Sequence, residues 1–290
     1  MNRLDLRGQI GGPGRGSPGK TSIGGDSMSG KSLTELASRR EMIIGLAAGT
    51  AFLTGCAENA ALGRNQLLLV SDDQLASLSD QAWRDSLGRE RILRDPSYTR
   101  RLNRVGDRIV AASGQTHLDW EFVVFDSPTI NAWVLPNGKV GFYKGILDVM
   151  DTDDHIATVM GHEVGHVTGR HSAERASQQM AAQVGLELLS AALGSNQNTV
   201  QYTDDIGAAL GMGVTLGVLL PYSRQHEYEA DRLGVDYMAA SRYDPRQAID
   251  FWVAMSTLHQ GGQLEFMSTH PSDDNRIAAM QAHMSAAGYV

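Results

Sequence analysis

The residues best suited to chemistry are two histidines and a glutamate in the stretch Gly-His-Glu-Val-Gly-His, residues 161–166. His162 and His166 are four residues apart, so a helix would place both imidazoles on one face, where they can bind a single Zn²⁺. Glu163 would project about 100° round the helix from His162, beside the metal and not on it. From there its carboxylate can take a proton from zinc-bound water as a general base. The motif predicts a catalytic zinc site inside a helix.

A catalytic zinc site needs a third protein ligand, while the fourth position stays open for water. One candidate is His171, because residues 166–171 nearly copy the metzincin extension H-x-x-G-x-x-H. That extension would put the ligand at Ser172, so the spacing fails by one residue. We therefore interpret His171 as a polar residue near the helix end.

The other candidate lies downstream in Ser-Arg-Gln-His-Glu-Tyr-Glu-Ala-Asp, residues 223–231, where another helix is predicted to begin. Glu227 and Asp231 are four residues apart and share a face, so Glu227 can bind zinc while Asp231 hydrogen-bonds a ligand histidine. Glu229 projects elsewhere and is not expected to be a ligand. The alternative is a solvent-exposed acidic helix face, which we favour less because the histidine motif lies upstream.

The segment that carries the histidine motif has the apolar frame of a buried helix. Its flanking apolar residues are Ile156, Val159, Met160, Val164 and Val167. Asp153 and Asp154 suit the positive N-terminal end of this helix. Gly161 and Gly165 each cost about 1 kcal/mol of helix propensity relative to alanine, so we expect close packing against a neighbouring element there.

The whole pattern predicts an α+β fold that is mainly helical. Residues 72–113 show helical periodicity, and Pro96 separates two helices. The second of these carries an apolar stripe, made up of Leu102, Val105, Ile109 and Val110. From Thr152 onward the pattern is helical nearly to the end, and Asp244 with Pro245 opens one of the helices.

Three short apolar runs predict the strands of a small antiparallel sheet, namely Trp120 to Phe125, Ala132 to Leu135 and Val140 to Tyr143. The last two flank Pro-Asn-Gly-Lys, and Asn-Gly between apolar runs is typical of a β-hairpin. We expect Val140 to Tyr143 to form an edge of the sheet, where a substrate backbone can add as a further strand.

A glycine-interrupted apolar segment runs from Ile206 to Leu220 and ends at Pro221. A membrane-spanning helix needs about 20 residues, so this segment is too short to cross a bilayer. We interpret it as a tightly packed internal helix or hairpin-like segment near the zinc site, and the alternative is a segment that dips into a membrane.

The first 37 residues are predicted to be a disordered leader, with Met1 and Met28 as alternative start sites. Nine of the 23 residues from Gly8 to Gly30 are glycine, and almost none is apolar. The leader matches G-x-x-x-x-G-K-[ST] twice, at residues 14–21 and 25–32. A phosphate-binding loop must follow a buried strand and open a helix, and no apolar run of strand length precedes either match. We therefore expect no nucleotide binding.

Residues 38–55 have the layout of an export signal, with Arg39 and Arg40 followed by a mostly apolar run and then small residues. The arginine pair fits either a twin-arginine or a Sec signal. Cys56, the one cysteine of the chain, follows Leu-Thr-Gly and resembles the lipidated cysteine of a bacterial lipobox. The alternative is a buried core helix with an incidental cysteine. We expect cleavage before Cys56 and a single domain over residues 56–290.

The charge of the predicted domain excludes a nucleic-acid partner. Residues 56–290 carry 18 of the 25 Lys and Arg residues and 29 of the 33 Asp and Glu residues, a net charge of −11. This balance repels nucleic acid and provides no polybasic membrane patch. Membrane attachment is therefore expected through the lipid on Cys56.

Together the two motifs resemble the gluzincin zinc peptidases related to HtpX and the type-one prenyl-protein proteases. The resemblance rests on His162-Glu163-x-x-His166 followed by the segment 223–231, and it covers about residues 63–277. It includes three further short motifs, which are Asn131-Ala132, Thr269-His270-Pro271 and Arg276-Ile277. The export features and the short C-terminal part point to an exported bacterial lipoprotein branch without a helical-repeat domain.

The resemblance implies a zincin-like metallopeptidase domain with one Zn²⁺ per chain, bound by His162, His166 and Glu227. It implies an endopeptidase that hydrolyses peptide bonds of misfolded, damaged or misassembled cell-envelope proteins. The implied location is the bacterial envelope, facing the periplasm, and Ala57 after Cys56 favours the outer membrane over the inner. The alternative is a non-catalytic zinc-binding envelope lipoprotein with a chaperone-like or scaffold role.

The donor that stabilises the tetrahedral oxyanion is left open among Arg224, His226 and His270. His270 has a further interpretation, because its loop is stiffened by Pro271 and the resemblance places it in a recurrent motif. It could cap the open zinc position as a latency switch, or hydrogen-bond within the core.

Overall fold

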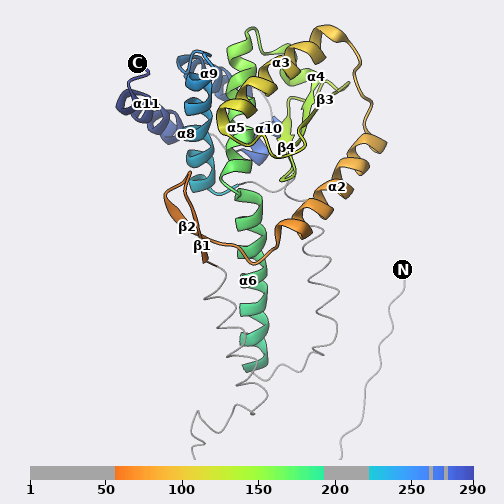
Figure 1. The fold of residues 1–290 in the computed structure, drawn as a ribbon, viewed down its shortest axis with the longest axis vertical. Coiled ribbons are helices and arrows are strands. Elements are labelled where there is room, and N and C mark those ends of the chain that lie inside the picture. Colours follow the sequence, from red (N-terminus) through yellow and green to blue (C-terminus); the bar gives the residue numbers. More distant parts are fainter. Residues whose placement is uncertain (1–55, 193–221, 261–263, 271–273) are drawn as a thin grey trace, which may run out of the picture. The chain divides into compact units, whose positions relative to one another are not determined.

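The computed structural model describes residues 56–192, 222–260, 264–270 and 274–290, which lie within one compact unit, Ala48–Val290. The expectations for the leader, the export signal and the segment 206–220 lie outside the described residues. In chain order (Figure 1) the elements are β1 (Cys56–Asn59), β2 (Arg64–Leu67), α2 (Asp72–Arg89), α3 (Pro96–Ser113), β3 (Glu121–Phe125), β4 (Ala132–Val134), β5 (Lys139–Tyr143), α4 (Lys144–Asp148), α5 (Asp153–Thr168), α6 (His171–Ala192), α8 (Arg224–Ala240), α9 (Arg246–Gln260), α10 (Glu265–Thr269) and α11 (Asp274–Ala287).

Helix α5, which carries the histidine motif, packs against α8, α3, α9 and β4 (Figure 1). Its start is set by Thr152, whose hydroxyl accepts a hydrogen bond from the backbone N–H of His155 at 3.2 Å. Asp153 and Asp154 occupy the first turn, as predicted, where carboxylates interact favourably with the helix dipole. The capping hydroxyl and the two aspartates therefore account for the start of α5 at Asp153.

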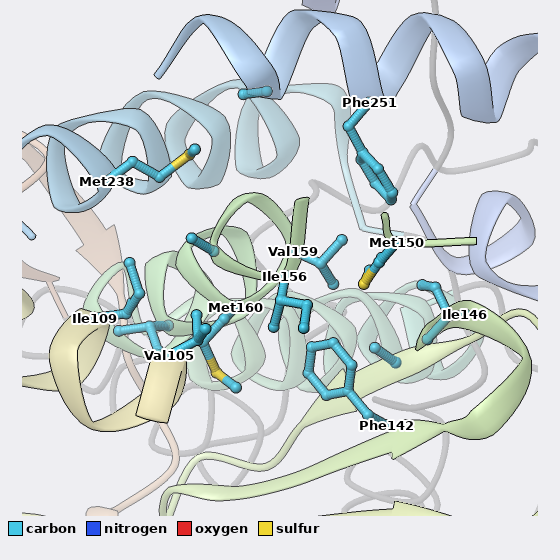
Figure 2. Packing of buried hydrophobic residues seen from close by; sticks show 14 of the residues in the cluster. Val105, Ile109, Phe142, Ile146, Met150, Ile156, Val159, Met160, Met238 and Phe251 are labelled. Carbon is cyan, nitrogen blue, oxygen red and sulfur yellow. The ribbon is translucent and has the colours of Figure 1, made fainter. Parts of the chain in front are cut away.

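Apolar packing holds α5 in place from several directions. Figure 2 shows its residues surrounded by side chains of α3, β5, α8 and α9, and the labelled ones from these elements and from α5 include Val105, Ile109, Phe142, Ile156, Val159, Met160, Met238 and Phe251. Ile156, Val159 and Met160 are all 0 % exposed. Fully burying one such side chain stabilises the fold by about 1.5–3 kcal/mol. Apolar contacts with several neighbouring elements therefore hold α5 in position.

The close packing expected at the two glycines of the motif is confirmed. A Cβ atom on Gly161 would lie 2.9 Å from the carbonyl oxygen of Gly234, and one on Gly165 would lie 2.8 Å from that of Ala230. Both neighbours belong to α8, which runs directly along α5. The glycines therefore let the backbones of the two helices approach more closely than any side chain would permit.

The sheet is small, as predicted, but it is mixed and not wholly antiparallel. Strands β4 and β5 form the expected antiparallel hairpin, whereas β3 pairs in parallel with β5 in the order β3-β5-β4. The chain passes from β3 to the far edge before the hairpin returns it to the middle. The expectation that Val140 to Tyr143 forms a sheet edge is therefore wrong, because both sides of β5 are already paired. Among the described strands, β3 and β4 lie at the two edges of this sheet.

The fold class is confirmed as α+β and mainly helical. A separate antiparallel hairpin, β1 with β2, precedes the first described helix and is absent from the sequence expectations. Among the described helices, none combines the length and the apolar character needed to cross a membrane.

Candidate metal centre

Three elements bring four ligand atoms together at the middle of α5. His162 and His166 come from α5, Glu227 from the first turn of α8, and His270 from the residue that follows α10. Their ligand atoms all lie within 4.8 Å of one another. Each of the four residues is at most 2 % exposed. The fold thus concentrates three imidazoles and one carboxylate at a buried point.

The donor set fits a zinc ion. The Nε2 atoms of His162 and His166 lie 3.1 Å apart, and the Glu227 carboxylate lies 3.4 Å from each of them. Two imidazoles and a carboxylate are ligands typical of catalytic zinc. Glu163, the adjacent glutamate, has one buried carboxylate oxygen without a hydrogen bond within the described part of the chain. Converging imidazole nitrogens and carboxylate oxygens at one buried point are what a divalent cation would satisfy.

The orientation of His162 is set by a carboxylate and an arginine. His162 Nδ1 lies 2.9 Å from Asp231 Oδ1, which leaves Nε2 directed toward Glu227. Arg276 binds both oxygens of Asp231 at 2.8 Å and also lies 2.8 Å from Glu227 Oε2. Asp231 therefore lies where it can act through His162, and Arg276 fixes both acids.

The local charges favour a cation at this point. Burial by itself would lower the pKa of His162, but the negative charges of Glu227 and Asp231 raise this pKa to about 9. Burial also opposes ionisation of Glu227, but Arg276, His270 and His162 hold the pKa of that carboxyl well below its usual range. A carboxylate kept ionised beside two imidazoles creates the negative field that binds a divalent cation.

Glu163 lies beside the four ligand atoms and is not one of them. It is 1 % exposed, and Oε1 lies 3.4 Å from His270 Nε2. Burial raises the pKa of the Glu163 carboxyl above its usual value. A carboxyl whose pKa is raised toward neutrality is a better proton acceptor for general-base chemistry than a solvated one.

His270 lies against His162, Glu227 and Glu163 in this structure. Its Nδ1 lies 3.1 Å from His162 Nε2 and 3.2 Å from Glu227 Oε1, and its Nε2 faces Glu163. The Phe266 ring packs on the imidazole at a centroid distance of 4.8 Å. The geometry thus places His270 as a fourth candidate ligand, 3.4 Å from the carboxylate of Glu163.

The other two candidate oxyanion donors are not among the four residues whose ligand atoms converge. Arg224 is exposed at the start of α8. His226 is buried, but its Nε2 lies 3.2 Å from Glu174 and its ring stacks on His171 at 4.5 Å. Because His226 precedes Glu227 by one residue, it projects about 100° away from the ligand face, toward α6.

Three residues near the group were missed or undervalued at the sequence level. His171 was interpreted as a polar residue near the helix end, but its Nδ1 lies 2.9 Å from His166 Nδ1. Arg170 just before it has a positive φ of 52°, and this sharp turn directs His171 back toward the motif. Tyr222 stacks on the His166 ring at a centroid distance of 3.9 Å. Arg276 was noted only as part of a short motif, since nothing in its spacing reveals the two acids that it binds.

A cleft of about 490 Å³ opens beside His166. Residues of α2, the β4–β5 hairpin, α5 and α6 line it, and its apolar side chains are Leu75, Ala76, Leu118, Val134, Pro136, Val167 and Ala173. Asp72, Asp73 and Arg170 contribute charge to the lining. The cleft therefore combines an apolar surface with polar groups and reaches His166, one of the four candidate metal ligands.

These features define a buried metal-binding centre built on two packed helices, with a carboxylate beside it and a cleft at its side. Residues 96–284 match peptidase family M48, and the chain belongs to that family. Zn²⁺ is the metal that this donor set and the family indicate.

Curated relatives carry protease names. The mitochondrial metalloendopeptidase OMA1 of Schizosaccharomyces pombe is 38 % identical over 191 residues, which cover 64 % of this chain and 54 % of that protein. Human OMA1 is 29 % identical over 229 residues, 74 % of this chain and 43 % of that protein. The beta-barrel assembly-enhancing protease of Escherichia coli is 27 % identical over 214 residues, 72 % of this chain and 43 % of that protein. The chain spans about half the length of these relatives.

Proposed function

We propose that the protein is a zinc-dependent metalloendopeptidase that cleaves misfolded, damaged or misassembled proteins of the cell envelope. The observation that carries the proposal is the convergence of His162, His166 and Glu227, with the buried carboxylate of Glu163 beside them. The names of the relatives, metalloendopeptidase and protease, support peptide-bond hydrolysis as the reaction. The words beta-barrel assembly in one of these names support cell-envelope proteins as the substrates.

In this mechanism His162, His166 and Glu227 would hold the zinc. When bound, Zn²⁺ supplies a Lewis acid that polarises the scissile carbonyl and lowers the pKa of the attacking water. Glu163 takes a proton from that water and returns it to the leaving amine. Asp231 and Arg276 keep His162 and Glu227 in place, so these groups need little reorganisation during the reaction.

The lining of the cleft beside His166 supports the proposal that the substrate is an unfolded protein. Unfolded proteins expose apolar side chains, and the lining offers an apolar surface for them. Val134 belongs to β4, an edge strand of the sheet, and also lines the cleft. An extended peptide in the cleft would therefore lie between this strand and α5, close to the metal-binding histidines.

We propose in addition that His270 caps the centre in a latent state. Its ring contacts His162, Glu227 and Glu163, and all four residues are nearly inaccessible to solvent. A substrate carbonyl must reach the same atoms, so His270 has to move before hydrolysis. The other interpretation, a hydrogen bond within the core, predicts loss of activity when the ring is removed.

Location and attachment are also proposals. We propose an exported lipoprotein branch related to HtpX and the type-one prenyl-protein proteases, with a lipid on Cys56 and an envelope location facing the periplasm. The sequence of residues 38–56 supports this. Mass spectrometry of the protein from membranes tests it, since a Cys56 peptide without lipid would contradict the proposal.

The central experiment compares Glu163→Gln with the parent chain. We expect casein cleavage to fall at least about 100-fold, the lower range of general acid–base contributions, while zinc content stays near one per chain. Glu58→Gln, the same change at an exposed position, is the control and should retain activity. Undiminished cleavage by Glu163→Gln would refute the proposed mechanism, and a parent that binds zinc without cleaving casein would favour a scaffold role.

A further inference from the structure

The N-terminal hairpin, residues 56–67, holds the end of the helix that carries the metal ligands. Asn59 donates a hydrogen bond from Nδ2 to the carbonyl oxygen of Thr168 at 3.0 Å, and Gln66 donates from Nε2 to that of Gly169 at 2.7 Å. The last carbonyls of a helix have no partner within it, so these two amides satisfy groups that would otherwise stay open. The hairpin lies outside the family match, which begins at residue 96.

The same hairpin contributes one arginine to a partly buried network of polar side chains. Arg64, on β2, binds Glu229 with Nε and Nη2 at 2.6 and 2.8 Å. It also binds Glu174 with Nη1 and Nη2, both at 2.8 Å. Paired contacts between a guanidinium and a carboxylate fix the orientation of both groups. Gln66 donates to Glu174 at 2.7 Å, so the hairpin holds that acid twice.

From Glu229 the chain of contacts leads to a metal ligand. Glu229 Oε2 lies 3.1 Å from His171 Nε2, and His171 Nδ1 lies 2.9 Å from His166 Nδ1. With a metal on Nε2, His166 would carry its proton on Nδ1 and donate it to His171 Nδ1, 2.9 Å away. His171 then carries its own proton on Nε2 and donates it to Glu229. The four residues Arg64, Glu229, His171 and His166 are called the relay below.

We infer that Arg64 is a positioning residue for the metal centre, which acts through Glu229 and His171 to set the tautomer and ring orientation of His166. The inference rests on the proposed zinc site. Without the guanidinium, Glu229 loses both arginine contacts and keeps the one from Gln225 Nε2 at 3.0 Å, so the acceptor of His171 is held less firmly. His171 could then present a proton toward His166, and that arrangement competes with metal binding by His166.

The test uses Arg64→Met in the full-length protein, because methionine retains much of the apolar stem and removes the charge. Loss of an outer hydrogen-bond partner typically weakens metal affinity by about 10- to 100-fold. We expect that loss for Zn²⁺, measured by competition with a chromophoric chelator. We also expect a shift of the visible bands of the Co²⁺-substituted protein, and a fall in kcat that exceeds the change in KM.

Arg232→Met is the matched control. Arg232 donates to the carbonyl oxygen of Ala61 at 2.7 Å, so it ties the same hairpin to α8 without touching the relay. We expect its Zn²⁺ affinity and Co²⁺ spectrum to match the parent even if its thermal stability falls. Equal losses of Zn²⁺ affinity in both variants would overturn the inference in favour of general hairpin docking. So would parent-like affinity in folded Arg64→Met.

If Arg64→Met fails to fold, Glu229→Gln tests the same step from the other side. Its amide is nearly the same size but can present a donor to His171, so a roughly 10-fold loss of Zn²⁺ affinity supports the relay and parent-like affinity refutes it. A parent that binds Zn²⁺ but does not cleave casein would refute only the proposed function, because the affinity comparison still reports on Arg64. A parent that binds no Zn²⁺ would refute both.

Discussion

The contact between α5 and α8 at Gly165 allows a quantitative prediction for Gly165→Ala. The added Cβ would lie 2.8 Å from the carbonyl oxygen and 3.1 Å from the Cα atom of Ala230, and both are backbone atoms. Ordinary contact begins at 3.4 Å, so the two helices would have to separate by about 0.6 Å. No flexible side chain can relieve the clash, so the helices themselves must move.

The expected free-energy change has two opposing parts. Alanine is favoured over glycine by about 1 kcal/mol in a helix interior. Overpacking of a well-packed interior costs about 1–3 kcal/mol, and here it acts on backbone. We therefore expect Gly165→Ala to lower the free energy of unfolding by up to about 2 kcal/mol. Zinc affinity should fall as well, since the substitution separates His166 on α5 from Glu227 on α8.

Gly185→Ala in α6 is the control, because nothing lies within 4 Å of its Cβ position. It should raise the free energy of unfolding by about 0.5–1 kcal/mol, from helix propensity alone. Denaturant unfolding with and without Zn²⁺ measures both variants. The prediction is refuted if Gly165→Ala stabilises the protein as much as Gly185→Ala and leaves the zinc affinity unchanged. The close approach of α5 and α8 would then not explain the glycine at position 165.

Two further predictions concern the cap and the start of α5. His270→Ala should raise kcat for casein about tenfold, the equivalent of one net hydrogen bond of ~1.4 kcal/mol, with zinc content unchanged; equal or lower activity would count against the latent cap. Asp153 is bound by Arg101 and Arg104 at 2.8 and 2.6 Å, and although burial opposes ionisation, the two arginines lower the pKa of Asp153. Its contribution is therefore present above the unfolded pKa of about 3.9 and is lost as the pH falls through the folded value. Asp153→Asn should cost about 0.5–1 kcal/mol at pH 7 and progressively less below pH ~4 in denaturant unfolding, and a cost independent of pH would contradict the ion pairs as its source.

The parts of the site that sequence predicted are those set by helical spacing. His162 and His166 share a face because they are four residues apart, and the same spacing aligns Glu227 with Asp231. The glycines of the motif indicated a close neighbour but could not name α8. Local signals of this kind survive folding because they depend on one element at a time.

The missed parts depend on pairs of elements. The parallel pairing of β3 with β5 follows from the path of the chain between β3 and β4, and no local pattern records it. His226 was a reasonable donor by proximity in sequence, yet its direction on α8 takes it to Glu174. The contact of His171 with His166 requires the turn at Arg170, whose left-handed conformation is rare for a residue other than glycine.

Helix α8 shows how one short segment supports both histidines of the candidate metal centre. Glu227 and Asp231 lie on the face toward α5, where one meets the ligand atoms and the other holds His162. Glu229 projects about 200° from Glu227, and for that reason it was set aside as a ligand. The same direction brings Glu229 to His171 and Arg64, and so to the far side of His166. Asp231 thus orients His162 directly, whereas Glu229 orients His166 through the ring of His171. The second route also needs Arg64, which the hairpin supplies.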